Sequence, residues 1–152
     1  MAGEIIAVVQ LRDVIERAIS EGSGDVVKSV ELASKYALER LKASIEFKRL
    51  SESTIRYAES KAIEYAREKV GKKAPDKVVR GALIEFLEVI LANEYNRCTP
   101  SEGLGMLFKT GLFCLALDDI SGIAGAYNPK KDEVIIAKSK YLWKLRVFPE
   151  VY

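Results

Sequence analysis

The pattern of apolar and polar residues changes once along the chain, near Gly111. Before that point apolar residues recur three or four positions apart, which is the spacing of amphipathic helices. After it, short apolar runs alternate with turn residues, which is typical of strands. The pattern predicts an α+β fold in which about five N-terminal helices pack on a small C-terminal antiparallel sheet of three or four strands.

The five helices are expected over residues 3–20, 25–50, 52–70, 75–96 and 99–110. Gly22 is suited to the left-handed position that closes the first helix, and Asp25 to the N-cap of the second. The segment from Ser51 to Thr54 is rich in capping residues and suits the start of the third. Gly71 and Pro75 separate the third helix from the fourth, because glycine commonly ends helices and proline begins them. The fourth helix is apolar on most sides, so we expect either a central core helix or a buried subunit interface.

Strands are expected over residues 112–117, 120–127, 133–138 and 141–147. In the third of these, Val134 and Ile136 should face opposite to Ile135, because successive residues of a strand alternate between its faces. Residues 1–152 read as a single domain, with a helical part over 1–110 and the sheet over 111–148.

Composition places the chain among intracellular proteins with a real core, since 49% of its residues are hydrophobic and 30% are charged. No apolar run reaches the ~20 residues of a membrane span, and no basic start precedes an apolar stretch, so we expect a cytoplasmic protein. Histidine is absent and Lys, Arg and Glu are plentiful, which suggests a hyperthermophile. Cys98 and Cys114 are expected to be reduced and buried, with a disulfide between them as the alternative.

Catalytic chemistry finds little support in the residues. Without histidine the chain has no imidazole for nucleophilic catalysis, and it has no phosphate-binding loop motif. We therefore expect a protein that is not an enzyme and needs no cofactor. Carboxylates are the exception: Glu85 and Glu88 lie three residues apart on one predicted helix, and Asp118 and Asp119 lie at a strand end. A metal-dependent hydrolase that uses them is one alternative, and solvated or turn carboxylates are the other.

Positive charge gathers in two segments of a nearly neutral chain. The net charge is only +2, from 24 basic and 22 acidic side chains. Residues 67–80 and 128–146 each carry six basic side chains against two acidic ones, a net charge of +4 per segment. Such clusters are the electrostatic signature of a polyanion-binding surface, although a loop such as the one with Lys72 and Lys73 is most often simply solvated.

Aromatic residues are interleaved with this positive charge. In a strand over residues 141–147, Tyr141 and Trp143 point to one face and Lys144 and Arg146 to the other. In the helix over residues 52–70, Arg56 and Tyr57 are followed at helical spacing by further lysines and tyrosines. Aromatic rings can stack on unpaired bases while basic groups neutralise phosphates. The competing interpretations are that Tyr141 and Trp143 pack on the helices, and that glutamates turn the helix into a salt-bridged face.

The sequence thus predicts sequence-independent binding of single-stranded nucleic acid in a cleft or a groove between subunits, by a homo-oligomer such as a dimer or tetramer. The candidate phosphate contacts are Arg56, Lys61, Lys72, Lys73, Lys77, Arg80, Lys140, Lys144 and Arg146. The candidate stacking residues are Tyr57, Tyr65, Tyr141 and Trp143. The rival prediction is an assembly or interaction subunit without nucleic-acid binding, which would use the wide apolar faces of the first and fourth helices.

The order of elements, the thermophile-like composition and the basic, aromatic segments 56–80 and 138–148 resemble the ThermoDBP group of single-stranded DNA-binding proteins from hyperthermophilic archaea. The resemblance covers most of the chain in outline and has no diagnostic motif. It implies binding of single strands, DNA in preference to RNA, without sequence readout or cofactor. A C-terminal zipper extension of the longer members is absent, so assembly would have to use the body of the domain.

Overall fold

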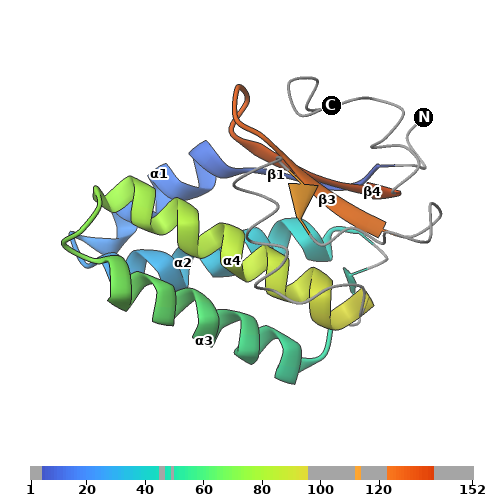
Figure 1. The fold of residues 1–152 in the computed structure, drawn as a ribbon, viewed down its shortest axis with the longest axis horizontal. Helices are drawn as coiled ribbons and strands as arrows, with labels where there is room; N and C mark the ends of the chain where they lie inside the picture. Colours follow the sequence, from blue (N-terminus) through green and yellow to red (C-terminus); the bar gives the residue numbers. More distant parts are fainter. Residues whose placement is uncertain (1–4, 45–46, 49, 96–111, 114–122, 139–152) are drawn as a thin grey trace.

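The computed structural model describes residues 5–44, 47–48, 50–95, 112–113 and 123–138, which form an α+β fold (Figure 1). In chain order the elements are β1 (Ile5–Gln10), α1 (Leu11–Gly22), α2 (Val26–Lys42), α3 (Glu52–Lys69), α4 (Pro75–Tyr95), β2 (Leu112–Phe113), β3 (Ile123–Asn128) and β4 (Glu133–Lys138). The strands form one antiparallel sheet in the order β1-β4-β3-β2.

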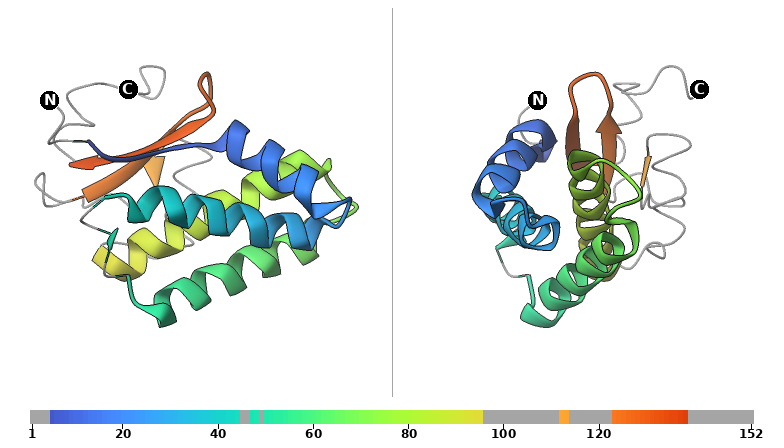
Figure 2. Two further views of the ribbon diagram at one scale, coloured as in Figure 1. Left: turned by 180° about the vertical axis from the view of Figure 1, so that it is seen from behind. Right: turned by 90° about the vertical axis from the view of Figure 1, so that its left-hand side faces the viewer.

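Helix α4 is the centre of the packing. It contacts α1, α2, α3 and β3, and α3 lies on the side of α4 that faces away from the sheet (Figures 1 and 2). Apolar side chains on most sides of α4, from Val78 to Leu91, are buried within this one chain. Of the two expectations for this helix, the central core helix is the one observed.

The N-terminal segment corrects the sequence-based prediction of a helix over residues 3–20. Residues 5–10 form strand β1, which pairs with β4, and the helix begins only at Leu11. The segment is a run of β-branched residues whose short apolar pattern fits both structures, and pairing with β4 decides between them. The sheet is therefore built from both ends of the chain, and is not wholly C-terminal.

Register in the sheet matches the alternation expected for β4. Val9 lies opposite Val134 and Ala7 opposite Ile136, and all four side chains are buried under the sheet. Ile135 lies on the other face and is partly exposed, as the alternation of its neighbours predicted. The strand β4 has the predicted bounds. Strand β3 extends to Asn128, one residue beyond its predicted end, and the predicted start over residues 120–122 lies outside the described residues.

Capping side chains fix most helix ends as the sequence predicted. Asp25 accepts a hydrogen bond from the Lys28 backbone N–H at 3.2 Å, and Ser51 caps α3 in the same way at Thr54. Gly71 has a φ of 81°, which glycine adopts without strain, and Pro75 begins α4. Helix α2 is shorter than expected and ends at Lys42, and Phe47, which follows it, is buried in the core.

Gly22 has a different role from the predicted one. The left-handed positions after α1 belong to Ser23, with φ 52°, and Gly24, with φ 88°, whereas Gly22 is the last helical residue. A Cβ at Gly22 would lie 2.2 Å from the Ser29 Oγ. Gly22 is therefore required because α1 and α2 approach each other closely at this point.

Several predictions lie outside the described residues: the helix over 99–110, the strand over 141–147, the two cysteines, and Asp118 and Asp119. No helix among the described residues is long and apolar enough to cross a membrane.

We expect Gly22→Ala to lower the free energy of unfolding by about 1–3 kcal/mol, because the new methyl group overlaps Ser29. Alanine is otherwise the better helix former, so a loss of stability isolates the steric effect. Urea denaturation of Gly22→Ala, Ser29→Ala and the double variant measures the coupling. The close-approach explanation fails if Ser29→Ala does not recover part of the stability lost in Gly22→Ala.

Candidate nucleic-acid interface

Two hollows lie along α3 and α4 and share Tyr65 and Lys73. The first, here called the mixed hollow, has a volume of about 400 Å³ and is lined by Lys61, Glu64, Tyr65, Glu68, Lys69, Lys73 and Glu85. The second, here called the tyrosine hollow, has a volume of about 230 Å³ and is lined by Tyr65, Lys73, Lys77, Arg80, Gly81, Ile84 and Tyr127. Five residues predicted from the sequence line these hollows: Lys61, Tyr65, Lys73, Lys77 and Arg80.

Small residues on α3 create the mixed hollow. Ala58, Ala62 and Ala66 are completely buried, and they let α3 pack closely on α4. Lys61 and Tyr65 neighbour these alanines and are four residues apart, so they lie one above the other at the edge of the helix contact. Lys61 and Tyr65 therefore lie at the edge of the contact between α3 and α4, where they line the mixed hollow.

Tyr65 lies directly on the backbone of α4. An ideal Cβ at Gly81 would be 2.3 Å from the Tyr65 hydroxyl oxygen and 2.5 Å from its Cζ, so only glycine leaves room for the ring. Gly81 is buried in the interior of α4, where glycine is a poor helix former. Packing explains the glycine, because any side chain at this position would overlap the Tyr65 ring.

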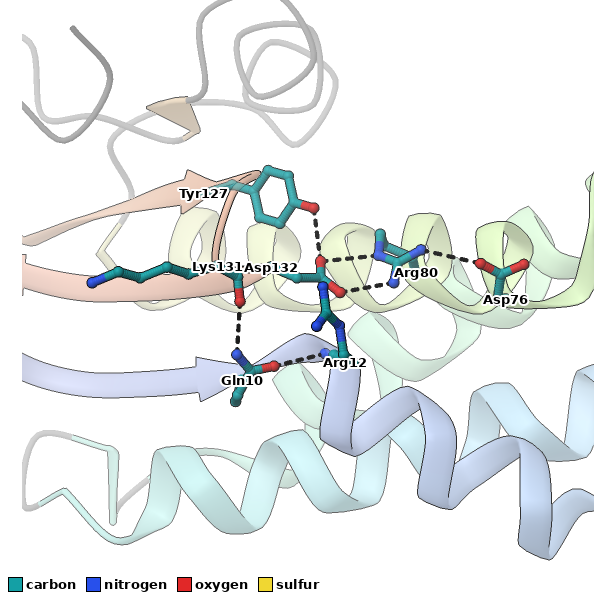
Figure 3. Close-up of polar contacts among 7 residues, drawn as sticks. All are labelled: Gln10, Arg12, Asp76, Arg80, Tyr127, Lys131 and Asp132. Atoms are coloured by element: carbon teal, nitrogen blue, oxygen red, sulfur yellow. Dashed lines mark hydrogen bonds and ion pairs between the residues drawn. The ribbon is translucent and has the colours of Figure 1, made fainter.

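Tyr127, which also lines the tyrosine hollow, is held by Asp132 in the turn between β3 and β4 (Figure 3). The Asp132 carboxylate accepts hydrogen bonds from Arg80 at 3.0 and 2.7 Å and from the Tyr127 hydroxyl at 2.7 Å. Burial, together with this hydrogen bond, raises the pKa of Tyr127 to about 12, so its hydroxyl remains a donor at neutral pH. The Tyr127 ring is therefore fixed in place.

The Arg80 guanidinium is engaged in two ion pairs. Besides Asp132 it contacts Asp76 at 3.5 Å, and the hydrogen bonds to Asp132 raise the pKa of its guanidinium further. Its charge is balanced by these two carboxylates. Lys73 and Lys77 differ, because neither makes an ion pair with any described residue.

The two hollows differ in charge. In the mixed hollow, Lys61 lies 3.9 Å from Glu64 and Lys69 lies 3.8 Å from Glu68, so positive and negative groups alternate. Among the described residues that line the tyrosine hollow there is no carboxylate. An anion is therefore favoured at the Lys73 and Lys77 side and disfavoured at the glutamates.

The other predicted residues within the described part of the chain lie outside both hollows. Tyr57 is 44% exposed on α3, with the Lys61 Nζ 5.6 Å from the centre of its ring. Arg56 is exposed and pairs with Glu52 at 3.9 Å, and Lys72 is exposed in the loop before α4. Tyr57 therefore lies next to Lys61 of the mixed hollow on α3, whereas Arg56 and Lys72 line neither hollow.

The predicted residues Lys140, Tyr141, Trp143, Lys144 and Arg146 lie outside the described residues. The structure adds Tyr127, Gly81 and Ile84, which sequence reasoning missed. A signal for Tyr127 was present, since it is an aromatic residue beside the basic segment 128–146. For Gly81 the only signal was a glycine within a strongly helical pattern.

A third hollow, of about 670 Å³, lies between the edge strand β1 and α2. Its tyrosine and one of its two arginines are already engaged with each other. Arg17 lies 3.8 Å over the Tyr36 ring and bonds to Glu21, and Glu21 also accepts a hydrogen bond from the Tyr36 hydroxyl. Arg40 lines the hollow as well, but the Tyr36 ring is covered by Arg17, so this hollow is the weaker candidate for stacking bases.

Glu85 and Glu88, the candidate metal ligands, lie on α4 beside the mixed hollow. Glu88 is completely buried, and neither of its carboxylate oxygens has a hydrogen-bond partner within the described part of the chain. Burial, and next the charge of Glu85, raise the pKa of Glu88 to about 9, and burial also raises the pKa of Glu85. Within the described part of the chain no three His, Cys, Asp or Glu side chains come together as a metal site.

We expect Asp132→Gly to lower the free energy of unfolding by about 2–3 kcal/mol, because it leaves Arg80 and Tyr127 without their acceptor. Asp132→Ala should cost about 1–2 kcal/mol more, since Asp132 has a φ of 51° that alanine tolerates poorly. Denaturant unfolding checks both values, with the exposed Asp13→Asn as the control. If Asp132→Gly were as stable as the wild-type protein, the Asp132 carboxylate would not stabilise the fold.

Glu88 should make the protein less stable as pH rises. Between its ordinary pKa of 4.5 and its folded value of about 9, the folded state retains a proton that the unfolded state releases, so the unfolding free energy falls with pH. We expect Glu88→Gln to remove most of the fall in melting temperature between roughly pH 5 and pH 9. Glu31→Gln, at an exposed position on α2, is the control. Parallel pH profiles for wild type and Glu88→Gln would show that Glu88 ionises normally.

Comparison of the chain with family models, with curated proteins and with solved structures gives no match. The proposal below is therefore argued from the geometry and charge of the two hollows.

Proposed function

We propose that this protein binds single-stranded nucleic acid without sequence preference, along the two hollows of α3 and α4. The observation that carries the proposal is the tyrosine hollow, where the described lining residues include two tyrosines and two lysines without an ion pair, and no carboxylate. Aromatic platforms beside a cationic groove are how proteins hold unpaired strands irrespective of sequence. DNA is preferred to RNA in this proposal because of the resemblance to archaeal DNA-binding proteins.

Charge sets the path of the strand. Lys73 and Lys77 can each neutralise a phosphate and release its condensed counterions, which supplies most of the affinity in non-specific binding. The glutamates of the mixed hollow repel phosphates, so the backbone follows the Lys73 and Lys77 side. The bases then lie toward Tyr65, which is shared by the two hollows.

Stacking supplies the rest of the affinity. A base on an aromatic ring contributes about 1–3 kcal/mol, and every base has a face that can stack. Tyr65 and Tyr127 line one hollow, and the exposed Tyr57 lies further along α3. The segment from Lys140 to Arg146 and a homo-oligomeric groove remain predicted additions to this surface.

The rival function, an assembly subunit without nucleic acid, was argued from wide apolar faces on the first and fourth helices. In the structure α4 is covered inside the chain, and residues 5–10 are a strand of the sheet. Most of those apolar residues therefore belong to the core of the domain, whereas Ile5 and Val8 on β1 are 37% and 43% exposed, so the assembly function stays the alternative.

We expect a labelled single strand to bind at low salt and to weaken steeply as salt is added. The double variant Lys73→Ala, Lys77→Ala should reduce the slope of log affinity against log salt by about 0.7 for each lost phosphate contact. Lys35→Ala, an exposed lysine on α2 that lines neither hollow, is the matched control and should leave the slope unchanged. Fluorescence anisotropy at several salt concentrations measures all three proteins.

Absence of binding at low salt would refute the proposed function. Binding with a wild-type salt slope in the double variant would place the interface elsewhere on the protein.

A further inference from the structure

The tyrosine hollow has the size of a site for a single ring system. Its volume of about 230 Å³ is below the ~300–1,000 Å³ of pockets that enclose a whole drug-sized ligand. Ile84, which is 2% exposed, and the buried Gly81 contribute apolar surface. Tyr65 and Tyr127 add two aromatic rings, so the lining suits a flat, largely apolar group.

Both rings are held before any ligand arrives. The Tyr127 hydroxyl donates to Asp132, which two hydrogen bonds from Arg80 hold in turn. Tyr65 lies on α4 where Gly81 has no side chain. Pre-organised rings lose little conformational entropy on binding, which favours affinity for a group that fits between them.

Charge completes the site. Lys73 and Lys77 line the same hollow, and neither is paired with a carboxylate among the described residues. Asp132, which contacts the lining residues Arg80 and Tyr127, is buried and accepts hydrogen bonds from both. A flat ring with an anionic group on each side therefore fits this lining better than a neutral or cationic molecule.

We propose that the tyrosine hollow receives one unpaired nucleobase of the bound strand, with the flanking phosphates at Lys73 and Lys77, and that Gly81 is the residue that positions Tyr65 for it. This inference rests on the proposed function and specifies how the strand is held. A base in the hollow has left its neighbours in the stack, so a duplex is excluded unless a pair is broken.

The test compares a labelled oligothymidylate with a strand of equal length in which every nucleotide is abasic. The thymidylate strand should bind about tenfold to a hundredfold more tightly at the same salt, because the abasic strand retains the phosphates and loses the stacking. The salt slopes of the two strands should agree, since both present the same phosphates to the lysines.

Gly81→Ala then assigns the difference to this hollow. The added methyl group displaces the Tyr65 ring, so we expect thymidylate binding to fall about tenfold and abasic binding to stay unchanged. Because the methyl group overlaps Tyr65, the melting temperature should also drop, so binding is compared at a temperature where circular dichroism shows both proteins folded. Tyr65→Phe keeps the ring and should bind like wild type, whereas Tyr65→Leu should behave like Gly81→Ala.

Each outcome separates the two proposals. If neither strand binds at low salt, the proposed function itself fails. If both strands bind equally well, or if Gly81→Ala weakens both by the same factor, the protein binds single strands but the base site is wrong.

Discussion

The arrangement of helices and strands depends on the hydrogen bonds that the carboxylate and the backbone carbonyl of Asp132 accept. The side chain ties Arg80 of α4 to Tyr127 of β3, and the backbone carbonyl accepts a hydrogen bond from Leu11 at 2.8 Å, where β1 becomes α1. Gln10 strengthens the same contact. Its side-chain amide donates to the backbone carbonyl of Lys131 at 2.7 Å, and its side-chain oxygen caps α1 (Figure 3). The buried Asp132 thus links the β1–α1 junction and strand β3 to the central helix α4.

The same constraint shapes the proposed binding surface. With Arg80 balanced by Asp132, the cations left uncompensated at the hollow are Lys73 and Lys77, so positive charge is displaced toward the loop before α4. Tyr127, which lines the same hollow as Tyr65, is held by the same carboxylate. An ion pair within the fold therefore decides which charges and which rings are available to a ligand.

Close packing between α3 and α4 also determines the position of a residue that lines the hollows, Tyr65. The alanine stripe of α3 and the absence of a side chain at Gly81 bring the helices together, and Tyr65 is seated in the contact. The buried carboxyl of Glu88 lies on the same helix without a partner, which opposes stability at alkaline pH because its ionised form is poorly solvated. Helix α4 thus combines the main apolar core with groups that do not serve packing alone.

By itself the sequence determined the α+β class, the caps at Asp25 and Ser51, the break at Gly71 and the facing of β4, because these depend on local backbone preference and on periodicity. It also identified basic and aromatic residues of α3 and the start of α4 that line the hollows. Only the tertiary structure decided that residues 5–10 are a strand and that Tyr127 joins Tyr65. Both outcomes depend on partners more than fifty residues away, and no local pattern specifies which distant segment will supply a hydrogen-bonding edge or an opposing ring.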